Sequence, residues 1–241
     1  MARARPGLTL RLLIWLLCKA RLHLLGPLLL SFQVSLCATL LASVLGVALA
    51  GVLSRRRFLG AQLLDAVLNA PLVLPPTVLG YYLLILLGRQ SPLGQAYEAV
   101  TGSSIVFTRT GATCAATLAA LPFVARSARA ALESLEPRFA EAAATLGAPP
   151  LRAFFRVLLP LASRGILAGV TLGFARSLGD FGVTLMVAGN IPGHTQTASL
   201  AIYDAIQGGR DAQAGGLAAI LTTLAVLSLY AINKLARTRM P

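Results

Sequence analysis

Long apolar runs, separated by short segments that hold most of the charges, restrict the fold of this sequence more than any other feature. One helix needs about 20 mostly apolar residues to cross the hydrocarbon core of a bilayer. Five stretches meet this requirement, so the sequence predicts an all-α membrane protein with five core transmembrane helices. Their approximate limits are 27–53, 65–88, 110–130, 157–181 and 214–235.

The charges between these runs are mostly positive, with 21 Lys and Arg residues against 8 Asp and Glu residues. A basic chain can bind nucleic acid, but here the charges occupy loops rather than one face of a soluble domain, so no nucleic-acid partner is expected. Lys and Arg favour the cytoplasmic side of a membrane. The segments 55–57, 126–156 and 234–239 are rich in them. The 126–156 loop and the C-terminus are therefore expected in the cytoplasm.

The N-terminal extension, residues 1–26, does not fit this alternation. Its basic residues would lie outside the cell if only five spans alternate, against the usual charge bias. The apolar part, 8–18, is short and contains Arg11. The segment could form a sixth, weak span, could lie at the membrane interface as an amphipathic helix, or could result from a mistaken start codon. No small-x-small site follows it, which argues against a cleaved signal peptide.

The loop between the third and fourth runs has a helical pattern. Its first half places apolar residues at i, i+3, i+4 and i+7, as one face of a helix does. Gly147 follows, as is typical of a helix C-terminus, and Pro149-Pro150 suits the start of a second helix. Arg152 and Arg156 face away from the second apolar stripe. The two stripes are Phe139, Ala142, Ala143 and Leu146, then Leu151, Phe154, Phe155 and Leu158.

The same loop resembles the E-A-A-x3-G-x9-hydrophobic-x-L-P motif of bacterial ABC importer permeases, and the topology around it is that of a type I permease. The resemblance implies a permease domain over 27–237, in the inner membrane, and a coupling loop at about 136–160 that docks in a groove of a cytoplasmic ATPase. The matching residues are Glu141, Ala142, Ala143, Gly147, Val157, Leu159 and Pro160.

Catalytic and cofactor motifs are not found in the sequence. Its only lysines, Lys19 and Lys234, do not follow a G-x-x-x-x-G, so no phosphate-binding loop is present and ATP hydrolysis is expected on a partner chain. Cys18, Cys37 and Cys114 lack the spacing of a metal site. Neither a catalytic site nor a metal or other cofactor is expected.

Two stretches suggest the substrate. Residues 69–82, which contain a double proline, and residues 174–193 closely resemble bacterial molybdate permeases, whereas sulfate permeases are similar mainly around the second stretch. The resemblance implies a homodimer in the lipid membrane, with separate ATPase subunits and a periplasmic molybdate-binding protein. A tungstate or sulfate permease remains an alternative. An intramembrane enzyme would need a nucleophile and base, and a passive channel would have no use for the coupling loop.

Several residues within the second and fourth runs are candidates for the translocation path. Pro75 and Pro76 should break the second run in mid-membrane, either to line a path or to pack beside a neighbouring helix. The small residues Thr77, Ser177 and Gly179 could likewise line the path or allow close packing. Arg176 and Asp180 are four residues apart and can form an ion pair on one helix. Charges within a membrane are candidates for function.

Overall fold

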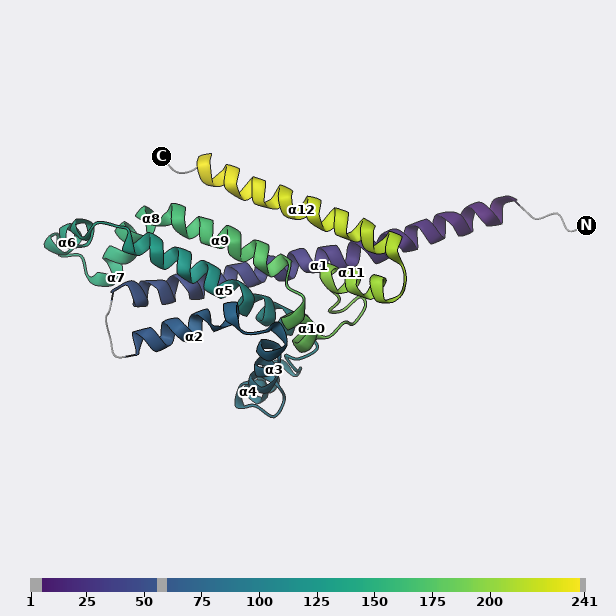
Figure 1. The fold of residues 1–241 in the computed structure, drawn as a ribbon, viewed down its shortest axis with the longest axis horizontal. Helices are drawn as coiled ribbons and strands as arrows, with labels where there is room; N and C mark the ends of the chain where they lie inside the picture. The colour runs from purple at the N-terminus through teal and green to yellow at the C-terminus, as the bar shows by residue number, and fades with distance from the viewer. Residues whose placement is uncertain (1–5, 56–59, 239–241) are drawn as a thin grey trace, which may run out of the picture.

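The computed structural model of the protein describes residues 6–55 and 60–238, and every regular element within these ranges is a helix. The all-α prediction is therefore confirmed. The helices form an elongated bundle in which α1 (Pro6–Arg55), α5 (Arg109–Glu133) and α9 (Ser163–Leu178) lie side by side along the long axis (Figure 1).

Helix α1 has 50 residues, which corresponds to about 75 Å at 1.5 Å per residue and exceeds the roughly 30 Å hydrocarbon core. Its apolar part, Leu25–Ser54, is long enough to cross a membrane. The part before Leu25 continues along the same helix and protrudes beyond the bundle (Figure 1). The division predicted at residue 26 is thus not marked by a helix break.

The second apolar run is broken at its double proline. Helix α2 (Ala61–Val73) ends before Leu74, and α3 (Pro76–Leu87) begins after Pro75, with both intervening residues in extended conformation. Proline at position 76 lacks the N–H that would continue the helix, which explains the break. The predicted break is confirmed. The short helix α4 (Pro92–Thr101) follows, capped by the Ser91 hydroxyl, which accepts from the Gly94 N–H at 2.8 Å.

Close packing of α5 against α9 forms the centre of the bundle. Alanine is frequent along the buried face of α5. Opposite it, α9 presents Gly165, Gly169 and Gly173, one on each successive turn. A Cβ on any of these glycines would come within 2.5–2.8 Å of an α5 side chain. Small residues of this kind let two membrane helices approach closely.

The fourth run differs from its prediction, because it is bent rather than continuous from 157 to 181. The helical segment Pro150–Leu161 meets α9 at 75° near Ala162. This segment consists of α7 (Pro150–Ala153), the wider π-helical turn η1 (Phe154–Leu158) and α8 (Leu159–Leu161). Pro160 cannot donate to the carbonyl four residues earlier, and its ring crowds that carbonyl, so the helix widens there.

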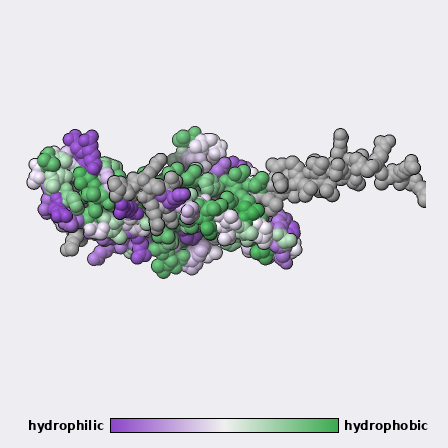
Figure 2. All heavy atoms as spheres, turned by 90° about the horizontal axis from the view of Figure 1, so that it is seen from above, coloured by the Kyte–Doolittle hydropathy of each residue, from purple (hydrophilic) through white to green (hydrophobic). Residues whose placement is uncertain are grey.

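Three more helices complete the described chain. These are α10 (Gly182–Ala188), α11 (Ala198–Gln207) and the long α12 (Asp211–Thr238). Among the described residues, Leu25–Ser54 and Asp211–Ile232 are each long and apolar enough to cross a membrane, and the bent pair could supply a third span. On the face seen in Figure 2, hydrophobic residues are frequent in the middle, and hydrophilic residues gather toward both ends, one of which carries α6 (Pro137–Thr145).

Candidate functional site

The 136–160 loop folds as two short helical segments joined at Gly147, as predicted. Gly147 has φ 73°, in the left-handed region that a side chain disfavours. Its N–H donates to the Ala144 carbonyl at 2.9 Å, and the Ala148 N–H donates to the Ala143 carbonyl at 3.0 Å. These two bonds are the pattern of a Schellman helix end. The loop is therefore an ordered unit at the tip of the molecule (Figure 1).

The apolar stripe of α6 is only partly buried. Ala143 is 7% exposed, whereas Leu146 is 88% exposed. Glu141 and Ala142 are also exposed.

Phe154 connects this loop to the bundle. It is buried and packs in one cluster with Ala50 of α1, Ala128 and Leu132 of α5, and Ala162 before α9. Its ring lies against Gly51, where a Cβ would come within 2.9 Å of the ring. Displacement of the loop would therefore act on three long helices through one aromatic side chain.

The last residues of the motif differ in their contact with this cluster. Leu159 packs against it from the side, while Pro160 is exposed. The Leu159 N–H donates to the Phe154 carbonyl, five residues earlier. Turns of this width are rare within α-helices and are frequent at functional sites.

A second candidate site lies where the double-proline break in the second run meets the break between α9 and α10, at the end of the fourth run. Helices α3 and α10 pack closely: a Cβ on Gly182 would come within 2.6 Å of the Pro76 Cβ, and a Cβ on Gly80 would overlap the Met186 side chain. Leu79 and Val183 belong to the cluster between them. The double proline and the α9–α10 break are thus adjacent in space.

Asp180 holds the α9–α10 break together. Its side chain is 1% exposed, and its Oδ1 accepts from Arg176 Nη1 at 3.1 Å. Its Oδ2 accepts from the Thr184 N–H at 3.0 Å and from Thr184 Oγ1 at 2.7 Å. The Ser199 hydroxyl donates to its backbone carbonyl at 2.8 Å. The predicted Arg176–Asp180 pair is confirmed, and Thr184 and Ser199 are partners that the sequence analysis missed.

The predicted path residues fall into two groups. Pro75, Pro76, Thr77 and Gly179 are exposed, at the two breaks. Ser177 is instead buried between α9 and α1, where its hydroxyl lies 3.3 Å from the Thr39 hydroxyl and donates to the Phe174 carbonyl at 2.9 Å. Ser177 therefore contributes to helix packing in this arrangement.

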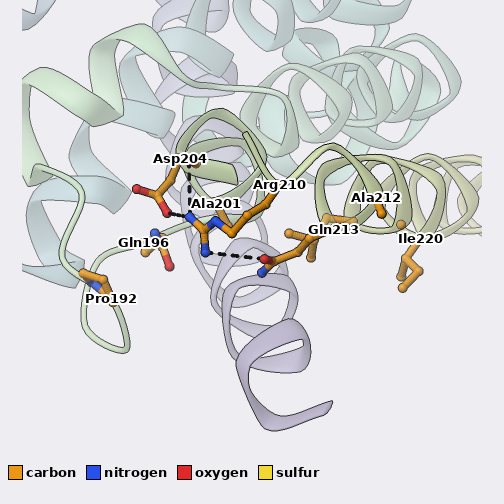
Figure 3. A pocket seen from close by; sticks show the side chains of 10 residues that line it. Pro192, Gln196, Ala201, Asp204, Arg210, Ala212, Gln213 and Ile220 are labelled. Carbon is orange, nitrogen blue, oxygen red and sulfur yellow. Dashed lines mark hydrogen bonds and ion pairs between the residues drawn. The ribbon is translucent and has the colours of Figure 1, made fainter. Parts of the chain in front are cut away.

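At the end opposite α6, the turn from α11 to α12 lines a pocket of about 700 Å³ (Figure 3). Arg210 crosses it and pairs with Asp204 at 2.6 Å. Gln196 and Gln213 add polar groups, and Leu217 adds an apolar wall. Within the described ranges, no three His, Cys, Asp or Glu side chains gather as metal ligands would.

The start of α5 and the residue Phe107 before it contact α10 and the loop that follows α10. Arg109 Nε donates to the His194 carbonyl at 3.1 Å. Phe107 has φ 62°, which is unusual for an aromatic residue, and its N–H donates to the Val187 carbonyl at 3.0 Å. The sequence carried no local signal for either contact, because both join segments about 80 residues apart.

Comparison with known proteins identifies relatives along nearly the whole chain. Residues 42–240 match the model of the family described as binding-protein-dependent transport system inner membrane component. The molybdenum transport system permease protein ModB of Escherichia coli K12 is 43% identical over 87% of this chain and 92% of its own length. The sulfate transport system permease protein CysT of Salmonella typhimurium is 37% identical over 85% of this chain and 75% of its own length.

A solved structure with a similar fold is that of a bacterial alginate ABC transporter in complex with an alginate pentasaccharide-bound periplasmic protein. Its matching chain gives a TM-score of 0.72 at 15% identity, and the alignment covers 89% of this chain and 78% of that one. At this identity the likeness concerns the fold alone, which is that of a type I ABC importer permease.

Proposed function

We propose that this chain, which belongs to the family of binding-protein-dependent transport system inner membrane components, carries molybdate as the permease subunit of an ABC importer. Membership makes it a multi-pass inner-membrane transporter subunit rather than an enzyme. The molybdate assignment rests on the 43% identity to a molybdenum permease, higher than the 37% to a sulfate permease. Tungstate and sulfate are the alternatives.

The ordered turn at Gly147 is the observation that best supports ATP coupling. We place the coupling loop and the C-terminus in the cytoplasm, where the basic segments lie. One ATPase subunit docks on each copy's 139–156 elements, with Glu141, Ala142 and the exposed Leu146 at the contact. Small alanines permit a close approach, and ATP hydrolysis takes place on that partner.

Phe154 transmits movement of the docked ATPase to the transmembrane helices. When the ATPases close, α6 moves with them, and the buried Phe154 ring moves the adjoining ends of α1, α5 and α9. Leu159 and Pro160 fix the angle at which the loop enters the bundle, since the 75° bend follows directly after them. Closure then opens the path outward, and hydrolysis returns it to the inward-open state.

The path itself forms between two copies of the chain. Its wall includes the exposed residues at the two helix breaks, Pro75, Pro76, Thr77 and Gly179. Ser177 is buried behind them and contributes to the packing of α9 on α1. Non-helical backbone in a membrane is tolerated where it faces protein or water, which suits a path. Arg176 is one-third exposed, so its charge can face a passing oxyanion while Asp180 holds it in place.

A periplasmic binding protein delivers the anion at the end that carries the Figure 3 pocket. That end lies opposite the coupling loop along the bundle (Figure 1). The solved alginate transporter, bound to its periplasmic protein, provides a precedent for such an arrangement in this fold.

Uptake of labelled molybdate by cells that lack this gene tests the substrate. We expect the restored gene to restore uptake, and we expect excess tungstate to suppress it more than excess sulfate does, since tungstate matches molybdate most closely in size and charge. The matched control is the same strain carrying the gene with the codons for Glu141–Gly147 deleted. Uptake that sulfate abolishes and tungstate spares would overturn the molybdate assignment while leaving family membership intact.

A further inference from the structure

Helix α2 lies at the edge of the described bundle, beside α5 and the last turns of α1 (Figure 1). Leu68 alone among its 13 residues is buried, in a cluster with Leu53 of α1 and Ala125 of α5. A helix with so few buried apolar contacts separates from its neighbours at a low free-energy cost. The polar contacts of α2 therefore matter for its position.

Arg129 of α5 supplies the main polar contact. Its Nη1 donates to Asp65 Oδ1 on α2 at 2.9 Å, and its Nε donates to Glu133 Oε1 at 2.7 Å. Asn69, one turn after Asp65, orients that carboxylate: its Nδ2 donates to the Asp65 carbonyl at 2.7 Å and to Oδ1 at 3.3 Å. One guanidinium thus binds a carboxylate on α2 and a second carboxylate on its own helix.

The two carboxylates respond differently to a movement of α2. Glu133 lies four residues after Arg129 on the same helix, so it stays within reach wherever α2 lies. Asp65 leaves when α2 moves. The three side chains are between one-third and one-half exposed, where water screens an ion pair and opening it costs little. Release of Asp65 therefore leaves Arg129 paired rather than isolated.

The part of α5 that holds α2 also contacts Phe154. Ala128 and Leu132, which flank Arg129 in the sequence, pack in the Phe154 cluster. Ala125, one turn earlier, packs instead in the cluster that includes α2. Movement of the coupling loop is thus transmitted to the turns of α5 on which α2 rests.

The other end of α2 borders the proposed path. The helix ends before Leu74, and α3 begins directly after Pro75. Pro76 lies against Gly182, at the start of α10. The extended residues between α2 and α3 form no helical backbone hydrogen bonds that a change in the angle of α2 would break. Helix α2 can therefore turn about this break while α3 stays packed on α10.

We propose that Arg129 is a positioning residue that exchanges its pairing when the ATPases close. Before closure it holds α2 against α5 through Asp65. Closure displaces the Phe154 cluster, Asp65 separates from Arg129, and Glu133 retains the guanidinium. Helix α2 then turns about the double-proline break and alters the wall of the path. The inference rests on the ATP coupling given under the proposed function.

ATP hydrolysis by the permease–ATPase complex in liposomes, without binding protein or molybdate, tests this exchange. Asp65→Asn removes the partner that Arg129 has before closure, so closure becomes easier and hydrolysis should rise about threefold, as suits a partly exposed ion pair. Glu133→Gln removes the partner that remains after release, so closure becomes harder and hydrolysis should fall about threefold. The effects are opposite because an equilibrium that closure shifts must in turn shift closure.

Two further variants serve as controls. Asp65→Glu keeps the charge and should hydrolyse ATP as the unmodified chain does. Glu98→Gln breaks a surface ion pair with Arg89, 3.6 Å away, and should also leave hydrolysis unchanged. A purely structural role of Arg129 would shift hydrolysis in the same direction in both test variants. That result, or no change in either of them, would overturn the exchange.

A covalent link in place of the ion pair tests whether α2 must move. Asp65→Cys/Arg129→Cys is made in a chain whose three cysteines are replaced by alanine, and a short bismaleimide then joins the two thiols. We expect the link to reduce the same hydrolysis at least about tenfold, because turnover needs the conformational step that the link prevents. N-ethylmaleimide, which modifies each thiol without joining them, should spare it.

The matched pair Arg89→Cys/Glu98→Cys should tolerate the bismaleimide, since no movement is expected between these residues. Full hydrolysis by the chain linked between positions 65 and 129 would contradict the proposal. Hydrolysis is measured without molybdate, so failed molybdate uptake alone would count only against the proposed function.

Discussion

Replacing Gly147 with proline is expected to reduce ATP-driven uptake at least about tenfold while the protein still inserts in the membrane. Gly147 has φ 73°, whereas proline is restricted to about −65°. The substitution also removes the N–H that donates to the Ala144 carbonyl. The turn after α6 cannot then form, so the ATPase would lose its contact with α6 or transmit motion in the wrong direction. A change of about 1.4 kcal/mol already corresponds to a tenfold effect.

Two matched variants separate coupling from folding in this experiment. Gly147→Asn should retain most of the uptake, because asparagine adopts positive φ more readily than other side chains. Gly102→Pro imposes the same backbone conflict at φ 71°, but in the turn that follows α4, outside the 136–160 loop. It should impair ATP-driven uptake far less. Normal coupling in Gly147→Pro, or an equal loss in Gly102→Pro, would show that this turn has no special role.

Asp180→Ala is expected to lower the stability of the folded protein by about 2 kcal/mol, because a buried donor left without an acceptor costs about 1–3 kcal/mol. The substitution leaves the Arg176 guanidinium without its carboxylate and the buried Thr184 N–H without an acceptor. The α9–α10 break would then lose the group that holds it. Thermal unfolding in detergent, followed by loss of monodisperse protein, measures the effect.

The control is a second ion pair of the same type at the surface. Asp204 and Arg210 lie 2.6 Å apart, but their side chains are each nearly half exposed (Figure 3). Exposed pairs contribute about 0–1 kcal/mol, so Asp204→Ala should barely shift the unfolding midpoint. If both variants lower it equally, burial of Asp180 is not what makes this carboxylate important.

The two short helices of the 136–160 loop could be predicted from sequence because their signals are local. Helical periodicity, a glycine at the helix end and a double proline specify two short helices and the turn between them. Burial was less predictable. The stripe that contains Leu146 identified one face of a short helix but not how much of it is buried, and this side chain is 88% exposed. The periodicity identifies the apolar face, and we propose that the partner ATPase covers it.

The helix breaks show the limit of such reasoning. The double proline predicted its own break, whereas the 75° bend near Ala162 was missed because the apolar pattern continues through the single Pro160 without interruption. Helix α10 was missed as well. It has 7 residues, too few for a periodic pattern, and depends on Asp180, which accepts from the Thr184 N–H. An Asp four residues before a Thr is by itself a weak sequence signal for the start of a helix.

Transport by the reconstituted importer tests the central claim most directly. The permease and its ATPase are placed in liposomes with ATP inside, and the binding protein and labelled molybdate are added outside. We predict that molybdate accumulates only when both ATP and the binding protein are present. Molybdate entry that is independent of ATP would contradict the account, because it would indicate a passive channel rather than a coupled permease.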